Sequence, residues 1–363
     1  MKIAIFTNKP YNQCETFIKL QIDKLPFDII QYWGQKLPFN FEVINKKSNL
    51  FIRILNKAGL LKTPQIIDQF CDKISNDKLD LVLAQYGMVG AKVLPICIKL
   101  NLPLLVHFHG HDAVRKSVLE TFNNYKELFS YSKLTVISVS HEMTKRLIDI
   151  GCPKEKIIYN TYGPNDDFLN LKPNYSKKQF LSIGRFVEKK APHLTLLALQ
   201  KVIKIHPDLN MVFAGDGILL DSCKDLAEAL GIEDNINFVG RITPNDYQNY
   251  LKESLAYVQH SIEAQDGDME GTPVSILEAS AAGLPIISTI HAGIPDVIKH
   301  NETGLISKEK DIKAMANNML WILEHKDDAK QMGRKGKLRI EETFSMSHHI
   351  ENLTRIIELA ARP

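Results

Sequence analysis

The sequence predicts an α/β fold with two doubly wound parallel sheets, and three observations support this. Short β-branched runs alternate with helix-length segments along the chain. Gly, Pro or Asn bounds most of these runs, which is typical of βαβ units with parallel strands. The length of 363 residues and the hydrophobic content of 44% are those expected of a globular protein with two domains.

The runs fall into two sets of predicted strands. The first set comprises residues 2–7, 27–30, 79–85, 102–109, 134–139 and 156–160, and the second comprises 179–184, 210–215, 235–240, 255–260, 284–289 and 303–307. A polar stretch between the sets, residues 163–178, is predicted to be a linker. We therefore expect Rossmann-like domains at 1–165 and 175–345, facing a central cleft at the carboxyl ends of their strands. A final helix at 346–363 either stays on the second domain or crosses back to the first.

The overall charge and the cysteines exclude several classes of protein. With a formal net charge of +3, the chain has no strong field for nucleic acid, so no nucleic-acid partner is expected. Its five cysteines lie far apart without a CxxC pair, which argues against a zinc site and a disulfide framework. No run approaches the roughly 18 apolar residues of a membrane span, and the first apolar run is too short for a signal peptide. We expect a cytoplasmic protein with reduced thiols.

The stretch EGTPVSILEASAAGLPIIST, residues 270–289, joins two carboxylates to a predicted helix start. Thr272 is expected to be the N-cap and Pro273 the first residue of a helix at 273–282, which a glycine then ends. The unpaired N–H groups and the positive dipole at the helix start, near Val274, suit a phosphate.

The two carboxylates of this stretch suit a ligand with several hydroxyls. Glu270 lies just before the helix and Glu278 about 7 to 8 Å further along, at 1.5 Å per residue. Carboxylates accept hydrogen bonds from sugar hydroxyls. A nucleotide-sugar would place its phosphates at the helix start, its sugar near Glu270 and its ribose near Glu278. The alternative is a carboxylate favoured by the helix dipole and a solvated helix face, and the residues leave both open.

Two cations follow the strand predicted at 179–184. Gly184 permits a close approach of the backbone, and Arg185 and Lys190 come between it and the next helix. At the carboxyl edge of a sheet, these cations would neutralise a diphosphate and stabilise it as a leaving group. A solvated loop in which Glu188 pairs with either cation is the alternative.

A second glycine turn, GDG at 215–217, follows the strand predicted at 210–215. Gly215 permits a tight turn and another close approach of the backbone to a ligand. The pattern is short, so a purely structural turn is an equal alternative.

Three histidines and an aspartate gather at the end of the strand predicted at 102–109. If the strand persisted, alternation would place His107, His109 and His111 on one face, and with Asp112 they have the chemistry of a zinc site. A glycine between the last two histidines is expected to end the strand, and this argues against a metal. His107 is then a core histidine, while His109 or His111 contacts a reacting sugar.

Several motifs stand in a fixed order along residues 179–307: GRFVEKK, AGDG, FVGRI, EGTPVSILEASAAGLPIIST, AGIPDVI and TGLI. In this order the sequence resembles a family 4 glycosyltransferase of the GT-B fold, and the resemblance covers nearly the whole chain. It implies a retaining transferase that uses a nucleotide-sugar donor, with no metal or other cofactor. The acceptor would be a glycan or a lipid-linked saccharide in the biosynthesis of exopolysaccharide, capsule or lipopolysaccharide.

The resemblance also implies roles for single residues. The catalytic set would be His109, Arg185, Lys190 and Glu270. The donor-binding set would be Gly184, Arg185, Lys190, Gly215, Arg241, Glu270, Gly271, Thr272, Pro273, Val274 and Glu278. The two cations of the catalytic set would grip the diphosphate, Glu270 would hold the donor sugar, and His109 would contact that sugar during transfer. Glu278 would hold the ribose and Arg241 would lie beside the base, while His111 and Asp112 are secondary candidates.

Two features depart from the family pattern. Ala191 occupies a position where members often have glycine, which is a mild change for phosphate contact. Residues 7–21 lack the glycine-rich turn that many members have after the first strand. The segment NQCETFI within them instead resembles a subset that builds surface polysaccharides.

Residues 44–62 mix lysines with apolar residues, as a basic amphipathic helix does. Such a helix either lies on an anionic membrane surface, which would suit a lipid-linked acceptor, or packs its apolar face on the sheet. The expected location is cytoplasmic, with the inner face of the cell membrane as one option.

Three other functions compete with this one. A metal-dependent glycosyltransferase would use the DGD sequence from Asp266 to Asp268 to hold Mg²⁺ or Mn²⁺ on a diphosphate, but it would not need a second Rossmann-like domain. A GT-B nucleotide-sugar epimerase would need acid and base carboxylates at C2 of the sugar. A non-catalytic nucleotide-sugar-binding protein would need only the binding residues.

Overall fold

A computed structural model describes residues 1–9, 16–34, 42–43 and 63–362 of the chain. The amphipathic stretch 44–62 lies outside these residues, and so does the first part of the NQCETFI segment, residues 12–15. Contacts divide the chain into two compact units. The first unit consists of Met1–Thr161 and His349–Pro363, and the second of Tyr162–His348.

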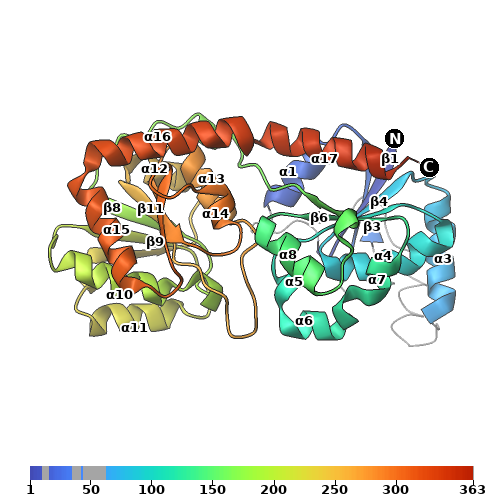
Figure 1. Cartoon of the computed structure of the whole chain (residues 1–363), viewed down its shortest axis with the longest axis horizontal. Helices are drawn as coiled ribbons and strands as arrows, with labels where there is room; N and C mark the ends of the chain where they lie inside the picture. Colours follow the sequence, from blue (N-terminus) through green and yellow to red (C-terminus); the bar gives the residue numbers. More distant parts are fainter. Residues whose placement is uncertain (10–15, 35–41, 44–62, 363) are drawn as a thin grey trace. The chain divides into compact units, whose positions relative to one another are not determined.

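The first unit is built on a seven-stranded sheet in the order β3-β2-β1-β4-β5-β6-β7. The strands are β1 (Lys2–Thr7), β2 (Asp28–Trp33), β3 (Glu42–Val43), β4 (Leu81–Gln85), β5 (Leu104–His107), β6 (Leu134–Ser138) and β7 (Ile157–Tyr159). The helices are α1 (Thr16–Lys24), α3 (Thr63–Ser75), α4 (Gly87–Leu100), α5 (His111–Val114), α6 (Lys116–Thr121), α7 (Lys126–Ser130), α8 (His141–Asp149) and most of α17 (Met346–Ala360). α1 and α17 lie side by side, joined by a hydrogen bond between Gln21 and His349 (Figure 1).

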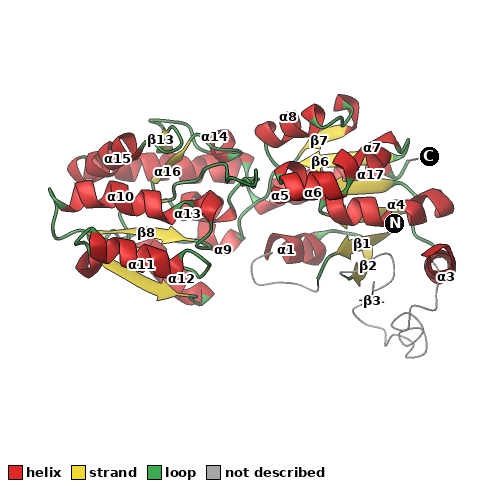
Figure 2. Ribbon diagram, turned by 90° about the horizontal axis from the view of Figure 1, so that it is seen from below, coloured by secondary structure: helices red, strands yellow, loops and turns green. Residues whose placement is uncertain are grey.

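The second unit is built on a six-stranded parallel sheet in the order β10-β9-β8-β11-β12-β13. The strands are β8 (Gln179–Ile183), β9 (Asn210–Ala214), β10 (Ile236–Gly240), β11 (Ala256–Val258), β12 (Ile286–Thr289) and β13 (Gly304–Ser307). The helices are α9 (Asp166–Leu169), α10 (Pro192–Ile203), α11 (Leu220–Ala229), α12 (Pro244–Glu253), α13 (Val274–Ala281), α14 (Ile294–Val297), α15 (Ile312–Glu324) and α16 (Lys326–Thr343). Helices lie on both faces of the sheet, with α10 against α15 and α13 against α16 (Figure 2).

The predicted α/β class with two Rossmann-like parallel sheets is confirmed. Each of the twelve predicted strands is present within three residues of its expected ends. The apolar runs of the inner strands β4, β5 and β12 are buried on both faces, as parallel strands covered by helices require. β3, which the sequence did not predict, has two residues and pairs antiparallel with β2 at the sheet edge. So short a pairing leaves no periodic pattern to detect.

The stretch 163–178, predicted to be a linker, belongs to the second unit and packs on it. It contains α9, whose Phe168 is buried, as is Leu171. The Tyr175 hydroxyl donates a hydrogen bond to the Gly283 carbonyl at 3.1 Å. Two buried apolar residues three positions apart anchor this stretch despite its prolines and polar residues.

The strand order of the second sheet fixes where a ligand site is expected. The chain builds β8, β9 and β10 outward in one direction and then returns to start β11 on the other side of β8. The loops after β8 and β11 therefore diverge at the carboxyl edge, which is the switch point where open α/β sheets bind ligands. In the first sheet the same reversal lies between β1 and β4. Within the described residues, no helix is both long and apolar enough to cross a membrane.

Candidate functional site

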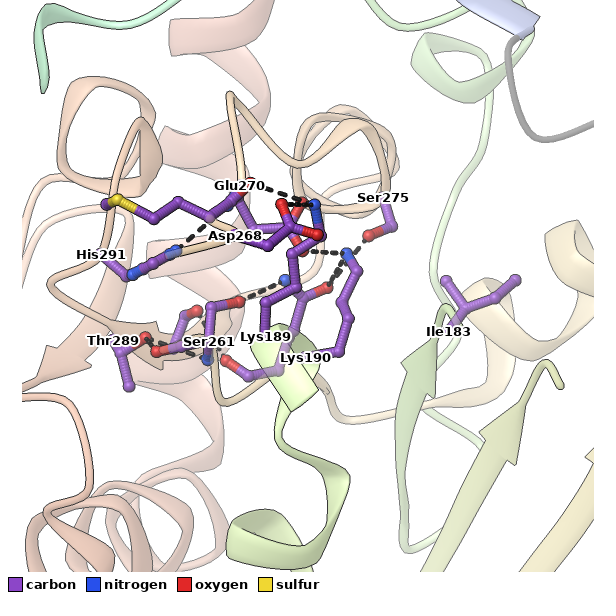
Figure 3. Close-up of polar contacts among 12 residues, drawn as sticks. Ile183, Lys189, Lys190, Ser261, Asp268, Glu270, Ser275, Thr289 and His291 are labelled. Carbon is purple, nitrogen blue, oxygen red and sulfur yellow. Dashed lines mark hydrogen bonds and ion pairs between the residues drawn. The ribbon is translucent and has the colours of Figure 1, made fainter. Parts of the chain in front are cut away.

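Lys190 and Glu270 meet at the switch point of the second sheet. Lys190 ends a 3₁₀ turn, Glu188–Lys190, in the loop after β8, whereas Glu270 comes from the long loop between β11 and α13. Lys190 Nζ lies 3.2 Å from Glu270 Oε1, and the side chains are 15% and 11% exposed (Figure 3). Two residues 80 positions apart in sequence thus form one nearly buried ion pair.

The ion pair keeps the Glu270 carboxylate charged. Burial alone would raise the pKa of Glu270, but the charges of Lys190 and Lys189 outweigh it and bring the pKa to about 2. Burial lowers the pKa of Lys190, and the neighbouring Glu270 carboxylate opposes this. Glu270 Oε1 lies close to the Lys190 ammonium, its charge partner, but it accepts no hydrogen bond of good geometry. This oxygen therefore retains capacity to accept a hydrogen bond from a hydroxyl.

Gln259, which the sequence analysis did not single out, connects the elements around this pair. It follows β11 directly and is 2% exposed. Its Oε1 accepts hydrogen bonds from Lys190 Nζ at 3.1 Å, from the Tyr257 hydroxyl at 3.1 Å and from Ser275 Oγ at 3.2 Å. Its Nε2 donates to Ser261 Oγ at 2.8 Å. A polar residue directly after the apolar run of β11 was the available signal, because such positions lie at the carboxyl edge of the sheet.

Lys189 holds the acidic loop that precedes Glu270. Its ammonium lies 2.9 Å from Asp268 Oδ1 and donates to the Met269 carbonyl at 3.0 Å (Figure 3). Asp266 Oδ1 in turn accepts from the backbone N–H of Asp268 at 2.9 Å. In the DGD sequence, considered above as a metal ligand, the Asp268 carboxylate is therefore paired with the buried Lys189. The Asp266 carboxylate stabilises the turn. The described residues contain no group of three or more His, Cys, Asp or Glu side chains that could hold a metal ion.

His291 supports Glu270 from the opposite side. The backbone N–H of Glu270 donates to His291 Nε2 at 3.2 Å, and His291 Nδ1 lies 2.6 Å from Glu309 Oε1. Because an N–H can only donate, Nε2 must be the acceptor and Nδ1 must carry the ring proton. Glu309 also accepts from the backbone N–H of Glu263 at 3.1 Å. The carboxylate thus orients the imidazole, and the imidazole orients the Glu270 backbone.

The helix after Glu270 begins one residue later than predicted. Pro273 is the N-cap, with φ −64° and ψ 114°, and the first helical residue is Val274. Ile276 and Leu277 donate to the Pro273 carbonyl, so the helical hydrogen bonds start there and Thr272 does not cap the helix through its side chain. Within the described residues, no hydrogen bond is found for the N–H groups of Val274 and Ser275. The helix start thus keeps donors for an anion.

Glu278 lies further along α13 and pairs with a tyrosine. Burial raises the pKa of Glu278 to about 8, while a hydrogen bond from the Tyr247 hydroxyl and the charge of Lys190 oppose the rise. Without a ligand, this carboxyl is therefore largely protonated near neutral pH. Tyr247 comes from α12, a neighbour that the sequence pattern did not indicate.

The remaining predicted donor-binding residues of the second unit surround this cluster. Gly184, Arg185, Lys190 and Gln259 help to line a small pocket of about 20 Å³ at the end of β8. Arg185 is exposed and has no ion-pair partner among the residues that the structure describes. Arg241 is also exposed, and its guanidinium lies 3.5 Å from Asp216 in the turn after β9.

Gly215 has a structural reason to be glycine. Its φ is +138°, and a Cβ there would lie 1.9 Å from the Gly184 carbonyl oxygen. The turns after β8 and β9 thus touch through their backbones. Gly271 contributes its carbonyl, which accepts from the Gly293 N–H at 2.9 Å. These glycines shape the site through the backbone.

In the first unit, β5 ends at His107, two residues before the end that the sequence predicted for this strand. His109 Nε2 lies 2.7 Å from Gln85 Oε1, and its ring packs edge-on against Tyr86 at 4.5 Å. His111 begins α5, so the strand alternation that would have placed the three histidines on one face does not persist. Burial lowers the pKa of His109 well below its usual value, and the neighbouring His107, His111 and His349 lower it further.

Asp112, a secondary candidate for contact with the sugar, is fully buried and holds the local backbone. Its carboxylate accepts from the N–H groups of Gly87 at 2.8 Å, His109 at 3.0 Å and Gly110 at 2.9 Å. These bonds join the loop after β5 to the start of α4. The geometry gives Asp112 a structural role and leaves His109 as the stronger candidate in this loop.

The chain is similar to known proteins over most of its length. Residues 166–339 match the family described as glycosyl transferases group 1. The chain is 30% identical over 289 residues to the amylovoran biosynthesis glycosyltransferase AmsK of Erwinia amylovora, covering 78% of this chain and 70% of that protein. It is 25% identical over 313 residues to the putative colanic acid biosynthesis glycosyltransferase WcaL of Escherichia coli K12, covering 83% and 76%.

Solved structures are similar to the chain in fold. The crystal structure of Anabaena Alr3699/HepE in complex with UDP aligns with a TM-score of 0.79 at 16% identity, covering 99% of this chain and 100% of that one. A glycosyltransferase from Rickettsia africae aligns with a TM-score of 0.77 at 18% identity, covering 99% and 98%.

Proposed function

Since this chain belongs to the group 1 glycosyl transferases and has their GT-B fold, we propose that it moves a sugar from a nucleotide-sugar donor to a glycan or lipid-linked acceptor, with retention and without a metal. The observation that carries the proposal is the Lys190–Glu270 ion pair, joined through Gln259 at the switch point of the second sheet. Its neighbours are an exposed cation, Arg185, and the N–H groups at the start of α13. Cations and unpaired N–H groups suit a diphosphate, and the acidic side chains suit hydroxyls.

In this proposal the bond between the anomeric carbon and the diphosphate oxygen breaks. Positive charge develops on the sugar, and negative charge on the departing diphosphate. Lys190, Arg185 and the amides of Val274 and Ser275 offset the negative charge. The acceptor hydroxyl attacks from the same face, which retains the configuration, and its proton passes to the departing phosphate oxygen. Glu270 orients the donor sugar through its hydroxyls.

The contacts of the acidic loop before Glu270 also support transfer without a metal. Asp268, the second carboxylate of the DGD sequence, is paired with Lys189, whose side chain is 9% exposed. A cation would have to displace this buried ammonium before it could use the aspartate. Lys190 and Arg185 can supply the positive charge that a metal would otherwise provide.

We place the reaction in the biosynthesis of a cell-surface polysaccharide. The relatives AmsK and WcaL are named for the biosynthesis of amylovoran and colanic acid. The proposed location is the cytoplasm, at the inner membrane face if the acceptor is lipid-linked.

Thermal unfolding with a panel of UDP-, GDP- and ADP-sugars tests the donor site. One donor class should raise the melting temperature, because a ligand at 100 times its Kd adds about 2.7 kcal/mol to the free energy of unfolding. Lys190→Met should lose this response. Lys178→Met is the matched control, since Lys178 also forms an ion pair, with Asp208, but precedes β8 at the opposite edge of the sheet.

Transfer is then measured with the donor that binds and a set of lipid-linked saccharides, with and without EDTA. Full transfer in EDTA with retained anomeric configuration is expected. Formation of an epimer when the donor is incubated without acceptor would replace the proposal with the epimerase. If Lys190→Met and wild type respond equally to every nucleotide-sugar, the proposed donor site is wrong.

A further inference from the structure

The peptide group between Met269 and Glu270 is held at both of its polar ends. Lys189 Nζ donates to the Met269 carbonyl at 3.0 Å, and the Glu270 N–H donates to His291 Nε2 at 3.2 Å (Figure 3). The carbonyl and the N–H of a trans peptide point in opposite directions within one plane. The lysine and the histidine therefore fix the orientation of this plane from two sides.

This anchoring determines where the Glu270 carboxylate lies. The Gly271 carbonyl accepts from the Gly293 N–H at 2.9 Å, so the backbone is held on both sides of the Glu270 Cα. The carboxylate then lies 3.2 Å from the Lys190 ammonium. Lys190 also donates to Gln259, independently of Glu270. A looser peptide should therefore displace the carboxylate and leave the ammonium in place.

Glu309 determines which nitrogen of His291 is the acceptor. The His291 side chain is fully buried, and its Nδ1 lies 2.6 Å from Glu309 Oε1, while Glu309 Oε2 accepts from the Glu263 N–H at 3.1 Å. Burial tends to raise the pKa of Glu309, but the hydrogen bonds from His291 and from the Glu263 N–H outweigh it and lower the pKa. An ionised carboxylate only accepts, so the imidazole proton stays on Nδ1 and Nε2 is left to accept from Glu270.

These residues connect the ends of neighbouring strands. Glu263 follows β11, His291 follows β12 and Glu309 follows β13, and the three strands are adjacent in the sheet. The hydrogen bonds from Glu309 through His291 to the Glu270 N–H, called the relay below, tie the long loop between β11 and α13 to the ends of β12 and β13.

We propose that His291 and Glu309 are positioning residues of the donor site, which hold the Met269–Glu270 peptide so that the Glu270 carboxylate accepts hydrogen bonds from hydroxyls of the donor sugar. The proposal rests on the proposed function, in which Glu270 holds that sugar. It adds two residues that are assigned no contact with the donor. It also assigns their effect to the sugar and not to the diphosphate.

The positioning role predicts that transfer and diphosphate binding respond differently. Lys190 and Arg185, which are proposed to bind the diphosphate, have no printed bond to the relay, and Gln259 holds Lys190 in place. A group that orients a reactant and is displaced by about 1 Å can cost about 100-fold in rate. Loss of the relay should therefore lower kcat by about 10- to 100-fold and leave the Kd of the free nucleoside diphosphate within about twofold.

Two amide substitutions at His291 separate its two hydrogen bonds. The amide of glutamine reaches the position of Nε2, where its oxygen can accept from the Glu270 N–H. The amide of asparagine reaches only the position of Nδ1, where it can donate to Glu309. His291→Gln should therefore keep kcat within about threefold of wild type. His291→Asn should show the full loss of about 10- to 100-fold, because the Glu270 N–H then has no acceptor.

Thr289→Val is the matched control at the end of the same strand. The Thr289 hydroxyl accepts from the Ser261 N–H at 3.1 Å and donates to the Ser261 carbonyl at 2.6 Å. Valine has a similar shape, so this variant removes two buried hydrogen bonds without changing a contact of the Glu270 peptide. It should lower the melting temperature, since the Ser261 N–H is left unsatisfied, but keep kcat within about twofold.

Two-bond ¹H–¹⁵N correlation of histidine-labelled apoprotein tests the relay without a donor. In wild type, the signals that His291→Gln removes should show the proton on Nδ1. Glu309→Leu should convert His291 to a mixture of tautomers, because the acceptor that holds this proton is gone. It should also lower kcat as His291→Asn does.

The outcomes separate this proposal from the proposed function. If wild-type His291 carries a proton on Nε2, or if His291→Gln loses as much kcat as His291→Asn, the positioning role is wrong even though transfer occurs. An equal loss of kcat and of diphosphate affinity in His291→Asn would also contradict it. If Glu309→Leu changes the tautomer as expected but no sugar is transferred from any donor, the relay holds Glu270 and the transferase function is wrong.

Discussion

The two units bury polar groups at their candidate sites in different ways. The second unit uses charge, with Lys190 against Glu270 and Lys189 against Asp268. In the first unit, hydrogen bonds link His109 through Gln85 and Gln21 to His349, so this chain consists of neutral amides and imidazoles. The contrast fits the two ends of a nucleotide-sugar, because a diphosphate is anionic whereas a sugar offers neutral hydroxyls. The lesson is that the second unit offers charged side chains both to the diphosphate and to the sugar hydroxyls proposed to contact Glu270, whereas the polar groups around His109 are neutral.

The contrast also has consequences for stability. A buried ion pair is sensitive to the loss of one partner, since the remaining charge stays buried without compensation. A neutral chain loses only a hydrogen bond, typically about 1–3 kcal/mol when a buried group is left unsatisfied. Substitutions in the two clusters should therefore differ in size and in pH dependence.

The largest effect is expected from breaking the Lys190–Glu270 pair. Lys190→Met and Glu270→Gln should each abolish transfer, and Lys190→Met should lower the free energy of unfolding by about 3–5 kcal/mol, as for a buried pair with one partner removed. The double variant, which removes both charges of the pair, should recover much of that stability while remaining inactive. Urea unfolding and a transfer assay measure both quantities.

Lys178→Met is again the control, because its ion pair with Asp208 is far more exposed. It should change the free energy of unfolding by no more than about 1 kcal/mol and leave transfer intact. A double variant that is less stable than both single variants would contradict the buried-pair account. An active Lys190→Met variant would instead contradict the catalytic role of the pair.

A smaller effect, specific to the second unit, is expected from Glu278. Its pKa is about 8 in the folded protein, against 4.5 as the ordinary value. Between these values the folded state keeps the proton and the unfolded state has lost it, so this group makes stability fall as pH rises. Glu278→Gln cannot ionise and should not show that loss. The melting temperature of the variant minus that of wild type should therefore increase from pH 5 to pH 8 and then level off.

The histidines of the first unit predict the opposite slope in acid. Burial lowers the pKa of His349 to about 4, and those of His107 and His109 also lie well below 6.5. Below pH 6.5 the unfolded state binds protons that the folded state refuses, so stability falls as pH decreases toward 4. Glu278→Gln should leave this acid limb unchanged. A variant whose difference from wild type is the same at pH 5 and pH 8 would remove Glu278 as the cause.

The sequence predicted the strands and the motif residues well because both depend on local patterns. The apolar runs, bounded by residues that break strands, located β8 and β11. The motifs that contain Lys190 and Glu270 come after these strands, so the two side chains can meet once β8 and β11 are neighbours in the sheet. Gln259 and His291 were missed, because their role depends on contacts across loops distant in sequence. The chain of hydrogen bonds from His109 to His349 was missed for the same reason, since Gln21 and His349 are 328 positions apart.

The N-terminal boundary of α13 shows a finer limit of sequence patterns. Both Thr272 and Pro273 are acceptable near a helix start, so propensity alone could not choose between them. The extended ψ of Pro273 decides the boundary, and the loop just before it is tied to the rest of the unit by the hydrogen bond from Gly293 N–H to the Gly271 carbonyl. Tertiary contacts thus placed the helix start within one residue of the local expectation.

The smallest effect is expected from the replacement of Ala191 by glycine. Ala191 has φ +38° and ψ 51° and immediately precedes α10, so its backbone is left-handed next to Lys190. An L-residue in this conformation costs about 1–2 kcal/mol, which glycine would relieve. Glycine in turn costs about 0.5–1 kcal/mol of backbone entropy, and it removes a fully buried methyl group. Ala191→Gly should therefore shift the free energy of unfolding by less than about 1 kcal/mol.

Ala191→Gly also tests whether the position of Lys190 beside Glu270 depends on the conformation of the turn at Ala191. If the alanine methyl group makes no contribution to the site, Ala191→Gly should keep kcat and the affinity for the nucleotide-sugar within about twofold. Twofold corresponds to about 0.4 kcal/mol, at 1.36 kcal/mol per factor of ten. A tenfold loss of donor affinity with unchanged stability would mean that the rigid alanine turn holds Lys190 against Glu270. In that case Lys190, like Glu270 beside His291, would owe its position to a residue that does not contact the donor.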